Sequence, residues 1–474
     1  MGEDAHVTQD APVDDAVPVT AGPVSCALVI SAGWLLAPGD TTTVIERGAV
    51  AVDGGRIVGM GPAREVAERW SGAEVVDLPG HVLMPGLVNA HTHLGMTMFR
   101  GMADDRDLDA FLAAVVPVEG AVLSADRVRR ATRAAAVESV LAGVTTALDM
   151  YFFVDAALDA ADQVGLRLLS GPVLFDGGPG SLAWDQLVEW AGAWLAEHPS
   201  RPGFRPVLGP HSTYTVSPEH LGAVAEMAGA SGALVHIHAS ETAAENELVR
   251  SRHGVRPVPL LADVGLLGPG TVLAHAVHLD DAELAAVAAS GSAVAHCPAS
   301  NLKLSSGVAR VPELLAAGAT VGIGTDGPAS SNDLDVLGAT RLAALLHKGV
   351  GTGAPGGPGA ADATNVSAGE ALRMATLGGA RSLGIDGDVG SLEVGKLADL
   401  IAVDLDRPHV QPVYDVASAV LYAAGRGDVT DVWVAGRPVV QAGRPTALDA
   451  SAVTDDLRDL QRVVADLRDG VGPV

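Results

Sequence analysis

One stretch decides the fold of this chain: Leu83-Met84-Pro85-Gly86-Leu87-Val88-Asn89-Ala90-His91-Thr92-His93. It is an apolar run that ends in two histidines one residue apart. In a β-strand, residues i and i+2 point to the same face, so we expect His91 and His93 to project together from the end of a buried strand. Neutral imidazole is a common ligand for zinc and iron. The stretch therefore predicts half of a metal site.

After His93, segments with a strand pattern alternate with segments with a helical pattern. Ser124, for example, is suited to cap a helix that runs to Ala142, and a strand pattern follows it. The predicted strands cover residues 85–91, 145–149, 166–174, 206–211, 233–238, 271–275, 293–296 and 320–326. Alternation of strands and helices implies parallel pairing, and eight such units predict an α/β fold, a closed (β/α)8 barrel of the TIM type.

Both ends of the chain have a different pattern, with short strands joined by tight turns. Residues 48–60 form a predicted hairpin around Asp53-Gly54-Gly55, and strand patterns return in 397–403 and 429–440. The expected domains are a disordered tail (1–23), the first part of a small β-sandwich domain (24–84), the metal-dependent barrel (85–387) and the second part of the small domain with a C-terminal helix (388–474).

Composition disfavours several classes of function. The formal net charge of −27 disfavours nucleic acid and anionic membranes as partners, because both bind mainly through lysine and arginine. The first residues lack the pattern of a secretory signal, and no apolar stretch of about 18 residues is uninterrupted. Only Cys26 and Cys297 are present, which suits a reducing compartment, so we expect a cytoplasmic protein. A homo-oligomer is compatible with all of these features.

The barrel prediction can be tested on the residues that end its strands, because active sites of this fold form at the carboxyl ends. Those ends carry His91, His93, Asp149, Asp176, His211, His238, His275, His296 and Asp326, which include six of the fifteen histidines. The most economical metal-binding set is His91, His93, His238 and Asp326, with one position open for water. No lysine near the fourth strand is available to bridge two metals, so we expect one ion per chain, zinc or iron.

Catalytic roles follow from the same strand ends. Glu241 lies three residues after His238, and a carboxylate beside a metal-activated water can take its proton and pass it to the leaving group. We expect His275 to stabilise the developing negative charge and Asp326 to accept a proton as well as bind the metal. His211 is expected to contact the substrate.

For three other polar residues near the strand ends, a structural role competes with a role in the site. His236 has the same parity as His238 but lies deeper, which favours an ordinary core residue. His296 is followed by the turn Cys297-Pro298, which slightly favours a structural role. For Asp149, the sequence favours a hydrogen-bond acceptor behind the metal ligands no more than any other role.

Several motifs together resemble a known family. The stretch 85–93 and Gly324-Thr325-Asp326-Gly327 resemble the amidohydrolase superfamily. The similarity is narrower in Met96-Thr97-Met98-Phe99-Arg100-Gly101, Asp149-Met150-Tyr151-Phe152, Pro210-His211-Ser212, His238-Ala239-Ser240-Glu241-Thr242 and Pro298-Ala299-Ser300-Asn301-Leu302-Lys303-Leu304. These resemble the methylthioadenosine/S-adenosylhomocysteine deaminase group, which is related to the triazine chlorohydrolases. The resemblance covers roughly residues 24–445.

The resemblance implies a zinc-dependent aminohydrolase that deaminates an aminopurine nucleoside and releases ammonia. It implies the same metal ligands and proton-transfer residues, with His211 against the substrate and Glu119 on the ribose hydroxyls. Members that accept S-adenosylhomocysteine can use arginines after the third strand for its carboxylate, and here no arginine lies between Arg167 and Arg201. A neutral nucleoside, adenosine or methylthioadenosine, is therefore expected unless Arg106 or another subunit supplies the contact.

Two alternatives stay open from the sequence. The same hydrolytic chemistry suits another N-heterocycle: a pterin, an s-triazine that loses amine or chloride, or aminodeoxyfutalosine. A protein of a different class, which binds a nucleoside or metal without turnover, would have a similar site.

Overall fold

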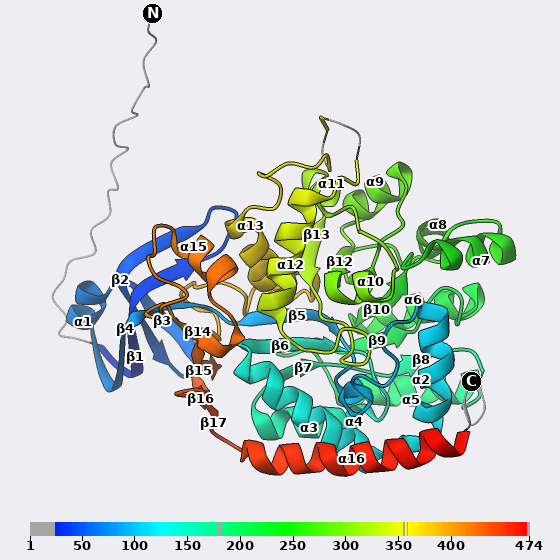
Figure 1. The fold of residues 1–474 in the computed structure, drawn as a ribbon, viewed down its shortest axis with the longest axis horizontal. Helices are drawn as coiled ribbons and strands as arrows, with labels where there is room; N and C mark the ends of the chain where they lie inside the picture. The colour runs from blue at the N-terminus through cyan, green and yellow to red at the C-terminus, as the bar shows by residue number, and fades with distance from the viewer. Residues whose placement is uncertain (1–23, 178–181, 354–355, 358, 472–474) are drawn as a thin grey trace, which may run out of the picture.

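The computed structural model describes residues 24–177, 182–353, 356–357 and 359–471, so the tail predicted as disordered, 1–23, lies outside the described residues. The described chain forms a (β/α)8 barrel and a small β domain beside it (Figure 1). Strands from both ends of the chain belong to one sheet in the small domain, at the left of Figure 1, where β4 pairs with β14.

The barrel strands are parallel, as strand–helix alternation requires. They are β5 (Leu87–Thr92), β6 (Val144–Asp149), β7 (Arg167–Leu169), β8 (Val173–Leu174), β9 (Val207–Pro210), β10 (Leu234–Ala239), β11 (Thr271–His275), β12 (Ala293–His296) and β13 (Thr320–Ile323). Beyond β13, the amide of Asp326 donates to the carbonyl of His91 at 3.0 Å, and this bond joins the last barrel strand to the first. The predicted barrel is therefore confirmed.

The third predicted strand differs from expectation, because it is interrupted between β7 and β8. β7 pairs with β6, and β8 pairs with β9. Gly171 lies so close to the carbonyl oxygen of Val207 that a Cβ atom there would be 1.8 Å from it. Pro172 has no amide hydrogen to donate to a neighbouring strand. The sequence of this strand thus requires a bend where continuous pairing was predicted.

Helices cover the outside of the barrel. They are α3 (Ala125–Leu141), α4 (Val154–Val164), α5 (Trp184–Glu197), α6 (Pro218–Ser231), α7 (Ala243–His253), α8 (Pro257–Asp263), α9 (Asp281–Ser290), α10 (Pro298–Lys303), α11 (Val311–Ala316), α12 (Val336–Gly349), α13 (Ala368–Arg373) and α14 (Gly379–Ser382), with η2 (Met374–Gly378) between the last two. Ser124 caps α3 as predicted, since its Oγ accepts from the amide of Arg127 at 3.3 Å.

The small domain is one hydrogen-bonded sheet, in the order β17-β16-β15-β14-β4-β1-β2-β3. Its strands are β1 (Val24–Ala37), β2 (Thr43–Asp53), β3 (Arg56–Pro62), β4 (Trp70–Pro85), β14 (Leu400–Asp404), β15 (Val429–Val434), β16 (Arg437–Gln441) and β17 (Arg444–Pro445); α1 (Ala63–Arg69) follows β3. Ile30, Val50, Leu400 and Trp433 belong to one buried cluster, so the two halves of the sheet enclose a common core, as in a sandwich. Gly54 and Gly55 both have positive φ, as the predicted hairpin turn requires.

Two further helices, α2 and α16, pack on each other outside the barrel. α2 (Leu108–Val122) follows η1 (Leu94–Phe99), and the C-terminal helix α16 (Ala450–Val471) runs along α3 and α2 at the bottom of Figure 1. Leu460 and Val464 of α16 share a buried cluster with Phe111 and Val115 of α2. The end of the chain therefore supports α2. The short elements α15 (Val416–Ser418), η3 (Ala419–Ala423) and η4 (Arg426–Asp428) lead to β15.

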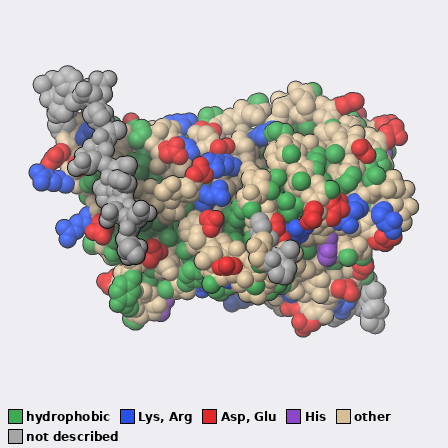
Figure 2. All heavy atoms as spheres, turned by 90° about the horizontal axis from the view of Figure 1, so that it is seen from above, with side chains coloured by type: hydrophobic (Ala, Val, Ile, Leu, Met, Phe, Trp, Pro, Cys, Tyr) green, Lys and Arg blue, Asp and Glu red, His purple; other side chains and the backbone are tan. Residues whose placement is uncertain are grey.

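Basic and acidic side chains are interspersed on the face seen in Figure 2. Of the helices in the described ranges, none has both the length and the apolar character that crossing a bilayer demands.

Candidate metal centre and active-site cavity

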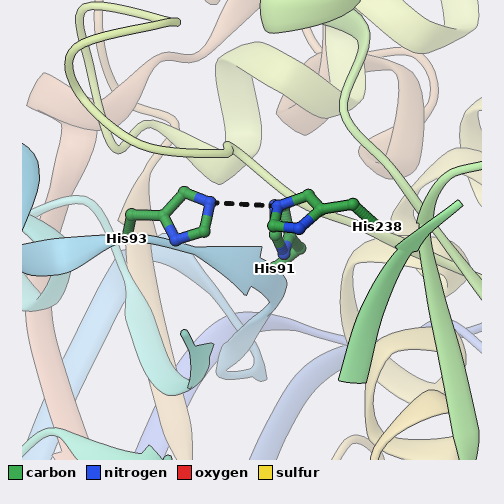
Figure 3. A group of neighbouring side chains, drawn as sticks. All are labelled: His91, His93 and His238. Carbon is green, nitrogen blue, oxygen red and sulfur yellow. Dashed lines mark hydrogen bonds between the residues drawn. The ribbon is translucent and has the colours of Figure 1, made fainter. Parts of the chain in front are cut away.

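Four side chains from three strand ends meet at the carboxyl end of the barrel. His91 ends β5 and His93 follows it, His238 comes from β10, and Asp326 follows β13. Asp326 Oδ1 lies 3.4 Å from His91 Nε2 and 3.3 Å from His93 Nε2, and His238 Nε2 lies 3.3 Å from His93 Nε2. Figure 3 shows the three imidazoles turned toward one another. The structure thus brings together the four residues predicted as metal ligands.

The other ring nitrogen of each histidine has a partner behind the group. His93 Nδ1 donates to the carbonyl of Met150 at 2.6 Å, and His238 Nδ1 donates to the carbonyl of His211 at 2.8 Å. A carbonyl only accepts, so these Nδ1 atoms carry the proton and the Nε2 atoms have a free lone pair. Such partners orient imidazoles that bind metal ions.

His91 rests on a second histidine. Its Nδ1 lies 2.7 Å from Nε2 of His236, and both side chains are completely buried. His91 Nε2 has no hydrogen-bond partner among the described residues, because Asp326 Oδ1 is too far away for a good bond. A buried ring nitrogen of this kind, beside two other imidazoles and a carboxylate, fits a bound zinc or iron ion.

Charge and burial favour the ligand forms of these residues. Burial lowers the pKa of His91 to about 3 and the pKa of His238 well below its usual value, so both are neutral. Burial opposes ionisation of Asp326, but the neighbouring histidines hold its pKa well below the usual range. Its Oδ2 also accepts from the hydroxyls of Ser300 at 2.6 Å and Ser330 at 2.7 Å.

Glu241 and His275 face each other beside this group. Glu241 Oε2 lies 3.7 Å from His275 Nε2, and Glu241 Oε1 accepts from the hydroxyl of Ser306 at 3.2 Å. Burial raises the pKa of Glu241, which makes this carboxylate a better proton acceptor. His275 Nδ1 donates to Asn301 Oδ1 at 2.8 Å, so its Nε2 points toward Glu241.

The backbone is strained where these residues leave their strands. Ser240, His275 and Asp326 have φ values of 53°, 70° and 60°, in the left-handed region that costs energy for residues other than glycine. The turn at Ser240 directs Glu241 toward the metal-binding group instead of continuing β10. Strain of this kind is typical of functional sites.

A cavity of about 650 Å³ opens in front of the group. One face of α2 lines it with Leu108, Phe111, Leu112, Val115 and Glu119, which recur at helical spacing. Glu119 Oε1 accepts from the hydroxyl of Tyr151 at 2.5 Å, and burial raises the pKa of Glu119 to about 7.

His211 also lines the cavity, and its Nδ1 lies 3.1 Å from the hydroxyl of Thr215. Burial lowers the pKa of His211 to about 4, so it faces the cavity as a neutral ring. Both residues predicted to contact the substrate therefore face the same cavity as Glu241.

Other strand-end residues lie outside the cavity or at its rim. Asp149 Oδ1 accepts from the amide of Leu94 at 2.7 Å, so of the roles left open by the sequence it has that of a hydrogen-bond acceptor behind the ligands. His296 contacts His347 at 3.3 Å and is completely buried. Asp176 lies at the rim of the cavity.

Sequence reasoning missed several residues of the site. It did not identify the contact of His236 with His91, the tyrosine behind Glu119, or the arginine and histidine that end α7 and line the cavity, Arg252 and His253. For α2, apolar residues that recur every three or four positions do predict one apolar helix face. For Arg252 no local signal exists, because only the fold brings the end of α7 to the cavity.

Comparison with known proteins gives consistent results. The model of the amidohydrolase family matches residues 82–439. The 5-methylthioadenosine/S-adenosylhomocysteine deaminase of Moorella thermoacetica is 42% identical over 415 residues, which cover 86% of this chain and 94% of that protein. The enzyme of the same name from Syntrophobacter fumaroxidans is 40% identical over 427 residues, or 88% and 94%.

Two solved structures have the same fold. An adenosine deaminase from Xanthomonas campestris with bound zinc superposes with a TM-score of 0.89 at 37% identity, over 94% of this chain and 100% of that one. Atrazine chlorohydrolase from Arthrobacter aurescens, in complex with zinc, has a TM-score of 0.82 at 28% identity, over 92% and 100%.

Proposed function

The chain belongs to the amidohydrolase family and is a zinc-dependent deaminase, and on this premise we propose that it deaminates an aminopurine nucleoside such as adenosine or methylthioadenosine. One observation carries the proposal. A buried carboxyl that can exchange a proton, Glu241, faces the same cavity as a neutral imidazole group suited to zinc. The names of the similar proteins supply the substrate class.

One zinc ion per chain would be held by His91, His93, His238 and Asp326. The neutral imidazoles, the ionised carboxylate and the unpartnered Nε2 of His91 support this assignment. The two solved zinc complexes support zinc over iron. When bound, zinc supplies Lewis-acid activation of water, lowering the pKa of that water toward ~7.

The protein's own residues move the protons. Glu241 takes a proton from the attacking water and gives it to the ring nitrogen beside the amino-bearing carbon, which makes that carbon electrophilic. His275 Nε2 hydrogen-bonds the oxygen that adds to the carbon. Asp326 accepts the remaining hydroxyl proton, which passes to the amino group. The carbon–nitrogen bond then breaks, ammonia leaves and a ring carbonyl remains.

Glu119 and His211 orient the nucleoside. An ionised carboxylate accepts from two vicinal hydroxyls, which a ribose offers and a triazine or pterin ring does not. The position of Glu119 inside the cavity, held by Tyr151, therefore supports a nucleoside over the other heterocycles. His211, which is neutral, offers its ring to the base.

The test is ammonia release from a panel of nucleosides, pterins and triazines, with zinc content measured on the same samples. Glu241→Gln should keep zinc and lower kcat by about 10²–10⁴-fold, the usual contribution of a proton-transfer group. Glu247→Gln, on the exposed side of α7 in a pair with Arg250, is the matched control. Full activity in Glu241→Gln would remove Glu241 from its role. Binding of a nucleoside without ammonia release would favour a non-enzymatic binding protein.

A further inference from the structure

The catalytic turn, Ser240-Glu241, has a strained backbone that the protein must hold in place. Ser240 has a φ of 53°, and a residue other than glycine keeps such a conformation only where its surroundings enforce it. On one side, the carbonyl of Ser240 accepts from the amides of Val277 at 3.0 Å and His278 at 2.9 Å. Both residues of the turn are buried, so their N–H groups need acceptors too.

Glu245, in the first turn of α7, is the acceptor for both N–H groups. Its Oε1 accepts from the amide of Ser240 at 3.0 Å, and its Oε2 accepts from the amide of Glu241 at 2.7 Å. One carboxylate thus holds two successive amides of the catalytic turn, one with each oxygen. Glu245 is buried, and it does not belong to the described residues that line the active-site cavity. It therefore contacts the turn and not the substrate.

Two other helices have a glutamate at the same position but use it differently. Glu245 is the third residue of α7, Glu370 is the third of α13 and Glu283 is the third of α9. Glu370 accepts from the amide of its N-cap residue Ser367 at 2.9 Å, and Glu283 accepts from that of Asp280 at 2.9 Å. Both bonds belong to ordinary capping boxes. Glu245 instead bonds to the residues one and two positions before the N-cap of α7.

α7 does not need this buried charge in order to begin. The hydroxyl of Thr242 already caps the helix, because its Oγ1 accepts from the amide of Glu245 at 3.0 Å. Burial raises the pKa of Glu245 to about 7, so keeping this carboxylate ionised costs free energy. The bonds from the amides of Glu241 and Ser240 act in the opposite direction, because they stabilise the ionised form. What the buried carboxylate contributes is therefore its two bonds to the catalytic turn.

We propose that Glu245 is a positioning residue for the deamination: its carboxylate fixes the left-handed turn at Ser240 and so holds the carboxyl of Glu241 where it exchanges protons with water and substrate. Proton transfer requires hydrogen-bond distance, so a small displacement of Glu241 lowers the rate of the chemical step more than it weakens substrate binding. This inference rests on the proton-transfer role proposed for Glu241. It adds to the reaction a residue that lies behind the cavity.

The first experiment compares Glu245→Gln with the wild type and with Glu370→Gln, the same change in an ordinary capping box. Glutamine has one acceptor oxygen, and its NH2 group faces the second amide as another donor. For the nucleoside that the wild type deaminates fastest, kcat in Glu245→Gln should fall about 10–100-fold, as for loss of a charge-assisted hydrogen bond. KM and zinc content should stay unchanged, and Glu370→Gln should keep all three wild-type values. Wild-type kcat in Glu245→Gln, or an equal fall in Glu370→Gln, would overturn the proposal.

A double variant separates positioning of Glu241 from general damage to the barrel. If Glu245 acts through Glu241, adding Glu245→Gln to Glu241→Gln should leave the low kcat of that variant unchanged. A merely structural role would lower kcat by the same factor in both backgrounds, and that result rejects positioning. Should Glu245→Gln not fold, Glu245→Asp takes its place, because aspartate keeps the charge but is one methylene too short for the same two bonds.

Hydrogen exchange tests the turn without a substrate. In Glu245→Gln, the amides of Ser240 and Glu241, followed in a peptide that contains both, should exchange about tenfold faster than in the wild type, since each has lost or weakened its acceptor. Glu370→Gln should leave their exchange unchanged. Wild-type exchange in Glu245→Gln would show that Glu245 does not hold the turn, even if kcat falls. If no nucleoside is deaminated, the proposed substrate class fails, and the exchange rates still decide whether Glu245 holds the turn.

Discussion

His236→Phe should weaken zinc binding by about 10–100-fold, although His236 is not one of the proposed ligands. His91 can present the Nε2 lone pair to a metal only if its Nδ1 carries the proton. His236 Nε2 lies 2.7 Å from His91 Nδ1 and accepts the hydrogen bond from its N–H, in a place with no access to water. Phenylalanine keeps a planar aromatic ring at this position but has no acceptor.

The structure sets the size of the effect. Without His236, the buried N–H of His91 has no acceptor, and an unsatisfied buried donor costs about 1–3 kcal/mol. A tenfold change in affinity corresponds to about 1.4 kcal/mol, so a loss of one to two orders of magnitude is expected. His236→Gln places an amide oxygen near the lost nitrogen and should restore most of the affinity.

The assay is competition between the protein and a chelator of known zinc affinity, measured with and without substrate. His296→Phe is the matched control, because His296 is equally buried at a strand end but contacts His347 rather than a ligand. If His236→Phe binds zinc as tightly as the wild type, His236 does not orient His91 and the reasoning is wrong. Equal losses in both variants would point to general damage to the barrel.

Two further predictions concern the cavity wall. Burial raises the pKa of Glu119 to about 7 from an ordinary value of 4.5, so the folded state loses stability as the pH rises through that interval. Glu119→Gln should therefore raise Tm relative to the wild type at pH 8 but not at pH 4, while KM for nucleosides rises; an equal Tm difference at both pH values would contradict this. Leu460 is completely buried in α16, so Leu460→Ala should lower the free energy of unfolding, measured with denaturant, by about 2–5 kcal/mol. It should also raise KM, because Leu460 packs on α2, which lines the cavity. Leu345→Ala, at a half-exposed position, is the control that should change both quantities little.

The residues that sequence predicted best are those positioned by local geometry. The two-residue period of a strand is enough to bring His91 and His93 to one side, and a strand end is enough to bring His238 to the same face of the barrel. The hairpin at Gly54 and Gly55 follows from turn chemistry alone. These predictions needed no knowledge of how the strands are spaced around the barrel.

Other features depend on distances between segments that are far apart in the chain. His91 lies on β5 and His236 lies on β10, far away in the sequence. Their contact therefore requires the curvature of the closed barrel. The bend between β7 and β8 depends on the approach of Val207 to Gly171. The position of Arg252 depends on where α7 ends relative to the Tyr214 loop. Local sequence patterns carry no information about contacts between segments that are far apart in the chain.

The shared sheet of the small domain has a consequence for how the chain folds during synthesis. Pro85 of β4 pairs with Leu400 of β14, and roughly 300 residues are made between them. At about 5–20 residues per second, that interval lasts some tens of seconds on the ribosome. The edge of β4 is exposed throughout, and exposed strand edges promote aggregation. The sheet of the small domain therefore cannot be completed before β14 to β17 have been made, so translation sets the earliest time at which this edge is covered.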